Sequence, residues 1–93
     1  MIRNFRHKGL DRFFRKSDHR GTEAKQADRI RRILDRLDAI ARPEDMALPG
    51  YAFYPLKGDR KNTYSVSVSG NWRITFKFVD GDASEVNLED YHS

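Results

Sequence analysis

The sequence predicts an α+β fold in which an N-terminal helical hairpin packs on one face of a small, twisted, mainly antiparallel sheet. Apolar residues recur at helical spacing through about residue 41 and alternate with polar residues from about residue 52, and glycine-containing turns separate the alternating segments. Strands that alternate in this way form a sheet with one packed face and one polar face. Ninety-three residues suit one small domain, which we expect to span residues 1–93.

The first helix is predicted from about Lys8 to Lys16. Its apolar stripe falls at positions i, i+3 and i+4, which are Leu10, Phe13 and Phe14. A short strand over residues 2–5 precedes this helix. Residues 17–21 are polar and include a glycine, so they predict a turn.

The second helix is predicted to begin after Thr22, a suitable N-cap, with Glu23 favourably placed in the first turn. It continues through about Ala41, and Pro43 closes it. One face of this helix is apolar and carries Ala27, Ile30, Ile33, Leu34, Leu37 and Ile40. The short connection predicts that the two helices form an antiparallel hairpin.

Four strands follow. The first covers Ala52 to Leu56, and the next three are marked by alternation over residues 64–68, 72–78 and 85–89. Tight turns are predicted at residues 69–71 and at Asp80-Gly81. Trp72 shares parity with the apolar residues of its strand, so we expect it to anchor the core rather than to stack on a base.

Charge is unevenly distributed along the chain. Residues 1–42 hold 13 Lys/Arg against 6 Asp/Glu, a net of +7, whereas the remainder holds 5 against 8, a net of −3. The polar side of the second helix carries a basic row formed by Lys25, Arg29, Arg32 and Arg36. This row is interpreted first as a solvated face partly paired with neighbouring carboxylates, and alternatively as a contact for RNA or for an acidic protein segment.

The chain contains no cysteine, no apolar run long enough to cross a bilayer and no signal-peptide core near its N-terminus. We therefore expect a cytoplasmic protein without disulfides or a membrane segment. His7 and His19 have no partners at metal-binding spacing and are interpreted as surface histidines.

The last hairpin brings polar residues together at one edge of the sheet. If it folds about residues 80–82, paired positions sum to about 162, so Arg73 faces Glu89 and Trp72 faces Asp90. The C-terminal tripeptide 90–92 then begins beside Asn71 and Arg73. Arg73 is expected on the polar face of the sheet, because its neighbours occupy the packed face.

These residue types suit the cleavage of RNA without a metal ion. The reaction needs a base for the 2′-hydroxyl proton, an acid for the leaving 5′-oxygen and cations around the phosphate. The imidazole of His92 exchanges protons near neutral pH, and Tyr91 could stack on a nucleotide or donate a proton. Lys57 and Arg73 could hold the phosphate, and Asp90 could orient a neighbour or act as a base.

The chain resembles the HigB branch of the RelE/ParE toxin superfamily over nearly its whole length. The resemblance is carried, in order, by the runs at residues 5–10, 55–60, 71–76 and 89–92. It implies a RelE/ParE-like fold and a site that needs no cofactor and no metal. The implied catalytic residues are His92, Tyr91, Asp90, Arg73 and Lys57, and the implied substrate-binding residues are Asn71, Tyr54 and Arg60. Some relatives carry a histidine where this chain has Tyr54, so Tyr54 either replaces that group as a polar contact or leaves proton transfer to His92.

The resemblance also implies a function. Members are toxins of type II toxin–antitoxin pairs that cut mRNA in the ribosomal A site and so inhibit translation. The implied partners are the ribosome, its mRNA and a HigA-like helix-turn-helix antitoxin, with operator DNA contacted only through the antitoxin complex. The alternatives are a ParE-like inhibitor of DNA gyrase and a catalytically inactive module that binds RNA or an antitoxin.

Overall fold

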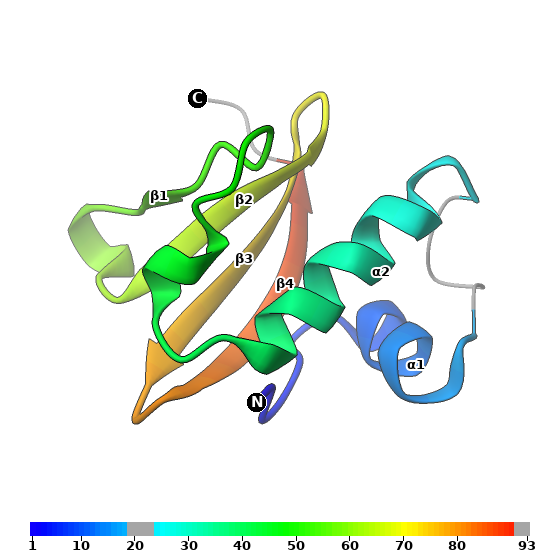
Figure 1. Cartoon of the computed structure of the whole chain (residues 1–93), viewed down its shortest axis with the longest axis horizontal. Coiled ribbons are helices and arrows are strands. Elements are labelled where there is room, and N and C mark those ends of the chain that lie inside the picture. The colour runs from blue at the N-terminus through cyan, green and yellow to red at the C-terminus, as the bar shows by residue number, and fades with distance from the viewer. Residues whose placement is uncertain (19–23, 91–93) are drawn as a thin grey trace.

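The computed structural model describes residues 1–18 and 24–90 and has two N-terminal helices against a four-stranded antiparallel sheet (Figure 1). The elements are α1 (Lys8–Lys16), α2 (Ala24–Ala39), the 3₁₀ turn η2 (Pro43–Met46), β1 (Tyr54–Pro55), the 3₁₀ turn η3 (Gly58–Arg60), β2 (Thr63–Ser69), β3 (Trp72–Val79) and β4 (Asp82–Asp90). The predicted α+β class is therefore confirmed. The predicted cap at Thr22 and first-turn residue Glu23 lie outside the described residues.

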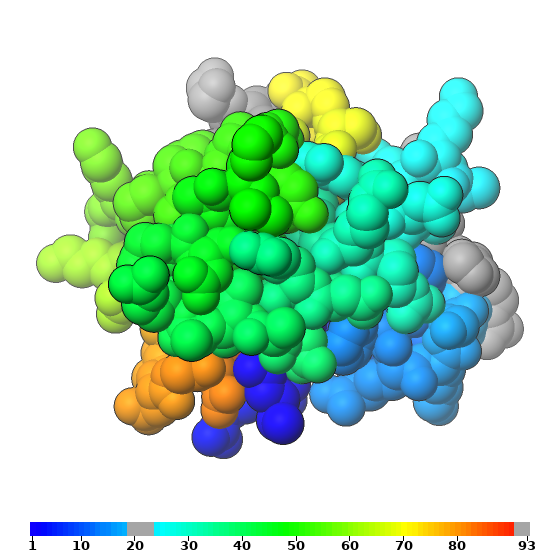
Figure 2. Space-filling model, in the orientation of Figure 1, coloured from blue at the N-terminus to red at the C-terminus, as the bar shows by residue number. Residues whose placement is uncertain are grey.

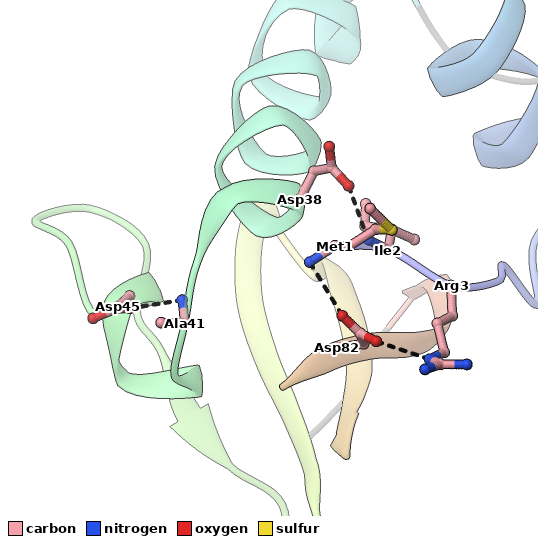
Figure 3. A network of polar contacts seen from close by, with 7 residues as sticks. All are labelled: Met1, Ile2, Arg3, Asp38, Ala41, Asp45 and Asp82. Atoms are coloured by element: carbon pink, nitrogen blue, oxygen red, sulfur yellow. Dashed lines mark hydrogen bonds and ion pairs between the residues drawn. The ribbon is translucent and has the colours of Figure 1, made fainter. Parts of the chain in front are cut away.

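The helices begin and end for identifiable reasons. At the start of α1 the Nδ1 atom of His7 accepts a hydrogen bond from the Leu10 amide at 3.1 Å, so His7 is the N-cap rather than an uninvolved surface residue. Helix α2 ends two residues earlier than predicted. The Asp45 carboxylate accepts from the amides of Ala41 and Arg42 at 3.1 and 3.2 Å and turns the chain into η2 (Figure 3).

The strands pair in the order β1-β2-β3-β4, each antiparallel to its neighbour. One face of the sheet packs against the helices, and in Figure 2 α2 and the segment that follows it cover that face. The fully buried side chains join both helices to β2, β3 and β4, and include Leu10, Phe13, Ile30, Leu34, Val66, Ile74, Phe76 and Val86. No helix in the described part of the chain has the length and apolar character to span a bilayer.

The N-terminal segment pairs with the outer edge of β4. The expected strand over residues 2–5 appears as two parallel bridges, Ile2 to Ala83 and Phe5 to Val86. A bulge in β4, with Glu85 at φ 49°, allows both Ala83 and Val86 to face the core although they are three residues apart. Figure 3 shows the polar contacts that hold this segment: Arg3 and the terminal amine on Asp82, and the Ile2 amide on Asp38 at 2.9 Å.

Two expectations about the sheet are wrong. Trp72 is 36% exposed, because it begins β3 beside a bulge between Ser67 and Ser69 in β2 and lies at the edge of the packed core. The first strand is only Tyr54–Pro55 rather than Ala52 to Leu56. Ala52 has a positive φ of 45°, and proline has no amide proton for the sheet ladder.

Candidate functional site

Arg73 lies on the polar face of β3, as its parity predicts. Its Nε atom donates to the Ser65 hydroxyl on β2, and its Nη2 atom donates to the Ala52 carbonyl at 2.6 Å. Ser65 is fully buried, so the polar face is partly covered rather than open to solvent. The guanidinium is therefore held in one orientation while part of its donor set stays available.

Tyr54, on β1, lies beside Arg73. The register pairs Tyr54 with Ser65, so its ring projects over the polar face next to Arg73. The Arg73 Cζ atom lies 4.8 Å from the centre of the Tyr54 ring, and Tyr54 as a residue is 37% exposed. A guanidinium stacked on an aromatic ring gains about 0.5–1 kcal/mol at an exposed site and is oriented by the contact. The structure thus brings the candidate residues Arg73 and Tyr54 into direct contact.

The end of β4 lies beside this pair. The register matches the sequence prediction, with Arg73 opposite Glu89 and Trp72 opposite Asp90. Asn71 precedes Trp72 in the turn between β2 and β3, at the same end of the sheet. Tyr91 and His92 follow Asp90 in the sequence and lie outside the described residues.

Arg60 is held by Glu89 through two parallel hydrogen bonds. The Nη1–Oε1 and Nη2–Oε2 distances are 3.0 and 2.6 Å, and the Thr75 hydroxyl also donates to this carboxylate. Hydrogen bonding by Arg60 lowers the pKa of Glu89, against the opposing effect of its burial and with a further contribution from Thr75. Because Glu89 lies opposite Arg73, this network joins η3 to the strand that carries the candidate site.

Lys57 is farther away. It precedes η3, its residue is exposed, and the neighbouring Leu56 amide donates to the Thr63 carbonyl at 2.8 Å. Arg73 pairs with Ser67, four residues along β2 from Thr63, which corresponds to roughly 13 Å of strand. The backbone of Lys57 thus lies toward the opposite end of the sheet from Asp90.

A polar hollow of about 160 Å³ opens on the same face between η3, β3 and β4. It combines three cations and three carboxylates, of which Lys77 and Glu85 form an ion pair at 3.2 Å. Its lining residues are Arg6, Asp59, Arg60, Thr63, Thr75, Lys77, Glu85, Asn87 and Glu89. The positive and negative charges that line the hollow largely cancel, so it offers a ligand hydrogen-bonding groups rather than a net charge.

Sequence reasoning assigned no role to the groups that hold the candidates in place: Ser65, Thr75, Glu89 and the carbonyl of Ala52. Strand register and parity were sufficient to place Ser65, Thr75 and Glu89 on the face of Arg73. The pairing of Glu89 with Arg60 had no sequence signal, because it depends on how η3 folds back over the sheet. The Ala52 contact depends on a positive φ that alanine rarely adopts.

Two of the four residues in the basic row on α2 bond the backbone of the protein itself. Arg29 and Arg36 donate to the backbone carbonyls of Gly50, Ser67 and Asp45, whereas Lys25 and Arg32 are exposed. Half of the row is thus structural, a role that the sequence analysis did not consider. Across residues 1–18 and 24–90, no three His, Cys, Asp or Glu side chains are grouped so that they could hold a metal ion.

Known proteins resemble this chain along its whole length. The family model described as "RelE-like toxin of type II toxin-antitoxin system HigB" matches residues 3–92. Endoribonuclease HigB of Proteus vulgaris is 44% identical over 92 residues, which cover 99% of this chain and all of that protein. Toxin HigB-1 of Vibrio cholerae serotype O1 is 31% identical over 91 residues, which cover 96% of each chain. The chain therefore belongs to the HigB-like family of RelE-like toxins of type II toxin–antitoxin systems.

Proposed function

We propose that this toxin is an endoribonuclease that cuts mRNA on the ribosome and thereby inhibits translation. One observation carries the proposal: the Arg73 guanidinium is fixed on the polar face of the sheet, stacked on Tyr54 and adjacent to the end of β4 at Asp90. Support comes from the relative named Endoribonuclease HigB, which matches this chain from end to end.

The proposed reaction is an attack of the 2′-hydroxyl on the neighbouring phosphate. A base removes the hydroxyl proton, and an acid protonates the leaving 5′-oxygen, so the products are a 2′,3′-cyclic phosphate and a 5′-hydroxyl. His92 exchanges these protons, and Tyr91 and Asp90 support it as a second proton carrier and an orienting carboxylate. Arg73 contacts the phosphate and stabilises the charge that develops in the transition state.

The remaining candidates would hold the RNA on either side of Arg73. Asn71 lies at the Asp90 end of the sheet, whereas Lys57 and Arg60 lie toward η3. Tyr54 offers a partly exposed ring for a base or sugar. Both outer nitrogens of Arg60 already bond Glu89, so a phosphate would compete with that carboxylate for the guanidinium.

Ribosome dependence fits a site with few catalytic groups. The ribosome would hold the message with its 2′-hydroxyl in line with the scissile bond, a positioning effect worth ~7–11 kcal/mol in favourable cases. A type II toxin has an antitoxin partner, which we propose to be a HigA-like helix-turn-helix protein that also carries the complex to operator DNA. Action on translating ribosomes places the toxin in the cytoplasm.

Product chemistry tests the proposal. A defined message is incubated with the toxin in a reconstituted translation system, with and without ribosomes, and the fragment ends are identified. We expect cleavage only with ribosomes, a 2′,3′-cyclic phosphate on the upstream fragment, and no cleavage when a single 2′-deoxynucleotide precedes the scissile phosphate. Intact message in the presence of translating ribosomes, together with inhibition of DNA gyrase, would instead support the ParE-like function.

A further inference from the structure

The Arg29 side chain extends from α2 to the sheet and contacts residues 50–52, the segment that leads into β1. Its Nη2 atom donates to the Gly50 carbonyl at 2.7 Å and to the Ser67 carbonyl at 3.1 Å. Its Cζ atom lies 4.5 Å from the centre of the Tyr51 ring, which is 9% exposed. The N–H group at the buried Nε atom of Arg29 has no hydrogen-bond acceptor among the described residues. Burying Arg29 here therefore leaves one hydrogen bond unmade, which is unfavourable.

Residues 50–52 have a constrained backbone. Gly50 and Ala52 have positive φ values of 82° and 45°, and an alanine adopts the latter only when its surroundings impose it. The Tyr51 carbonyl accepts from the Ser67 amide at 2.7 Å, which ties the middle of the segment to β2. Arg29 and β2 therefore hold residues 50–52 in a conformation that they would not otherwise favour.

Arg73 holds the same segment from the other face of the sheet. The carbonyl of Ala52 accepts from Arg73 Nη2 at 2.6 Å, and Ser67 is the strand partner of Arg73. Two arginines from different layers thus bond one short segment. Arg29 bonds the Gly50 carbonyl, two residues before the Ala52 carbonyl that Arg73 bonds.

We propose that Arg29 is a positioning residue for Arg73. Without the Arg29 side chain, residues 50–52 relax toward ordinary backbone angles, the Ala52 carbonyl moves, and the Arg73 guanidinium loses one of its fixed contacts. Because Arg29 lies on α2, the helical layer then helps to set the geometry of the RNA-cutting site. The expected effect on cleavage rests on the proposed function. The effect of Arg29 on the orientation of Arg73 does not rest on it and can be tested separately.

Helix α2 provides a matched control in Arg31. This arginine also combines a ring contact, at 4.6 Å from the centre of Phe13, with hydrogen bonds to the Phe13 carbonyl and the Ser17 hydroxyl. These contacts join α2 to α1 and do not involve residues 50–52. Arg29→Gln and Arg31→Gln therefore remove similar interactions from the same helix, and only the first disturbs the hold on Arg73.

The first measurement does not require RNA. The Arg73 Nε–H signal is identified in the nitrogen–proton NMR spectrum by its loss in Arg73→Lys, and its exchange with water is compared between variants. We expect Arg29→Gln to shift this signal and speed its exchange by about tenfold or more, and Arg31→Gln to leave it unchanged. An unchanged Arg73 signal in Arg29→Gln would overturn the inference. If Arg29→Gln does not fold, Arg29→Lys, which keeps the charge but loses the planar guanidinium over the Tyr51 ring, is judged by the same signal.

The second measurement is a double-mutant cycle on the cleavage rate of a ribosome-bound message. We expect Arg29→Gln to lower the maximal rate by about 10–100-fold with little change in half-saturating toxin concentration, because a displaced group mainly weakens transition-state contacts. In an Arg73→Lys background the same change should cost less than about twofold. Equal losses in both backgrounds, or equal losses from Arg31→Gln, would show a general structural role and refute the inference. If the wild-type protein cuts no message, the proposed function fails while the NMR result still decides the positioning of Arg73.

Discussion

Glu89→Gln should lower stability at neutral pH and have little effect in acid. The substitution keeps the size of the side chain but removes the charge that accepts two hydrogen bonds from Arg60, at 3.0 and 2.6 Å, and one from Thr75. Hydrogen bonds to a charged group contribute about 1.5–3 kcal/mol. The side chains of Arg60 and Glu89 are 39% and 23% exposed, so solvent screening reduces this to about 1–2 kcal/mol. For a domain of this size the loss corresponds to roughly 5–10 °C in Tm.

The pH dependence follows from the lowered pKa of Glu89. Arg60 stabilises the charged form in the folded state, so the contribution is fully present above the ordinary glutamate value of 4.5. It is lost as the pH falls from 4.5 through the pKa of Glu89 in the folded protein. Thermal melts of wild type and Glu89→Gln should therefore differ at pH 7 and converge in acid.

Glu85→Gln is the matched control for this experiment. Glu85 lies on the same strand but makes a single ion pair with Lys77, at 3.2 Å, in which both side chains are nearly half exposed. Such a pair is worth about 0–1 kcal/mol. Equal Tm losses from the two variants, or a Glu89→Gln deficit as large below the folded-state pKa as at pH 7, would refute the reasoning.

Three further predictions concern the helix cap, the core and the site. His7→Ala should cost about 1 kcal/mol by removing the cap of α1, as followed by denaturant unfolding, and His7→Asn should retain most of it. Burial lowers the pKa of His7, so the wild-type protein should lose stability below pH 6.5 and His7→Asn should lose less; an identical pH profile would contradict the cap. Phe76→Ala should cost about 3–5 kcal/mol, because Phe76 is fully buried at the centre of the sheet; a loss below about 1 kcal/mol would argue against that placement. Arg73→Lys should slow cleavage of ribosome-bound mRNA by about 100-fold, whereas Arg32→Lys on the exposed side of α2 should leave the rate unchanged.

The sequence was most informative where local patterns decide structure. The stripe of Leu10, Phe13 and Phe14 predicted the bounds of α1, because periodicity depends on neighbours in the chain. The prediction that Arg73 faces Glu89 assumed a hairpin folded about residues 80–82 and is correct. The structure reaches this register differently, through a tighter turn that pairs Val79 with Asp82 and a bulge at Glu85 that adds one residue to β4.

The rest depends on long-range packing. A bulge in β2 leaves Trp72 partly exposed although its parity matches the core, and η3 folds so that Arg60 meets Glu89. The contact of Arg73 with Ala52 requires a left-handed alanine held in place from α2. No local pattern encodes such contacts, because each is fixed by a residue 21 or 29 positions away or by a bulge.

The central claim is that His92 and Arg73 act on one phosphate. The most direct test is a structure of the toxin on a ribosome whose message carries a 2′-deoxynucleotide before the scissile phosphate, so that it binds without being cut. We expect the imidazole and the guanidinium to lie within hydrogen-bonding distance of that phosphate and its attacking position. A complex in which the message avoids the polar face of the sheet, or in which His92 and Arg73 lie on opposite sides of the domain, would contradict the account.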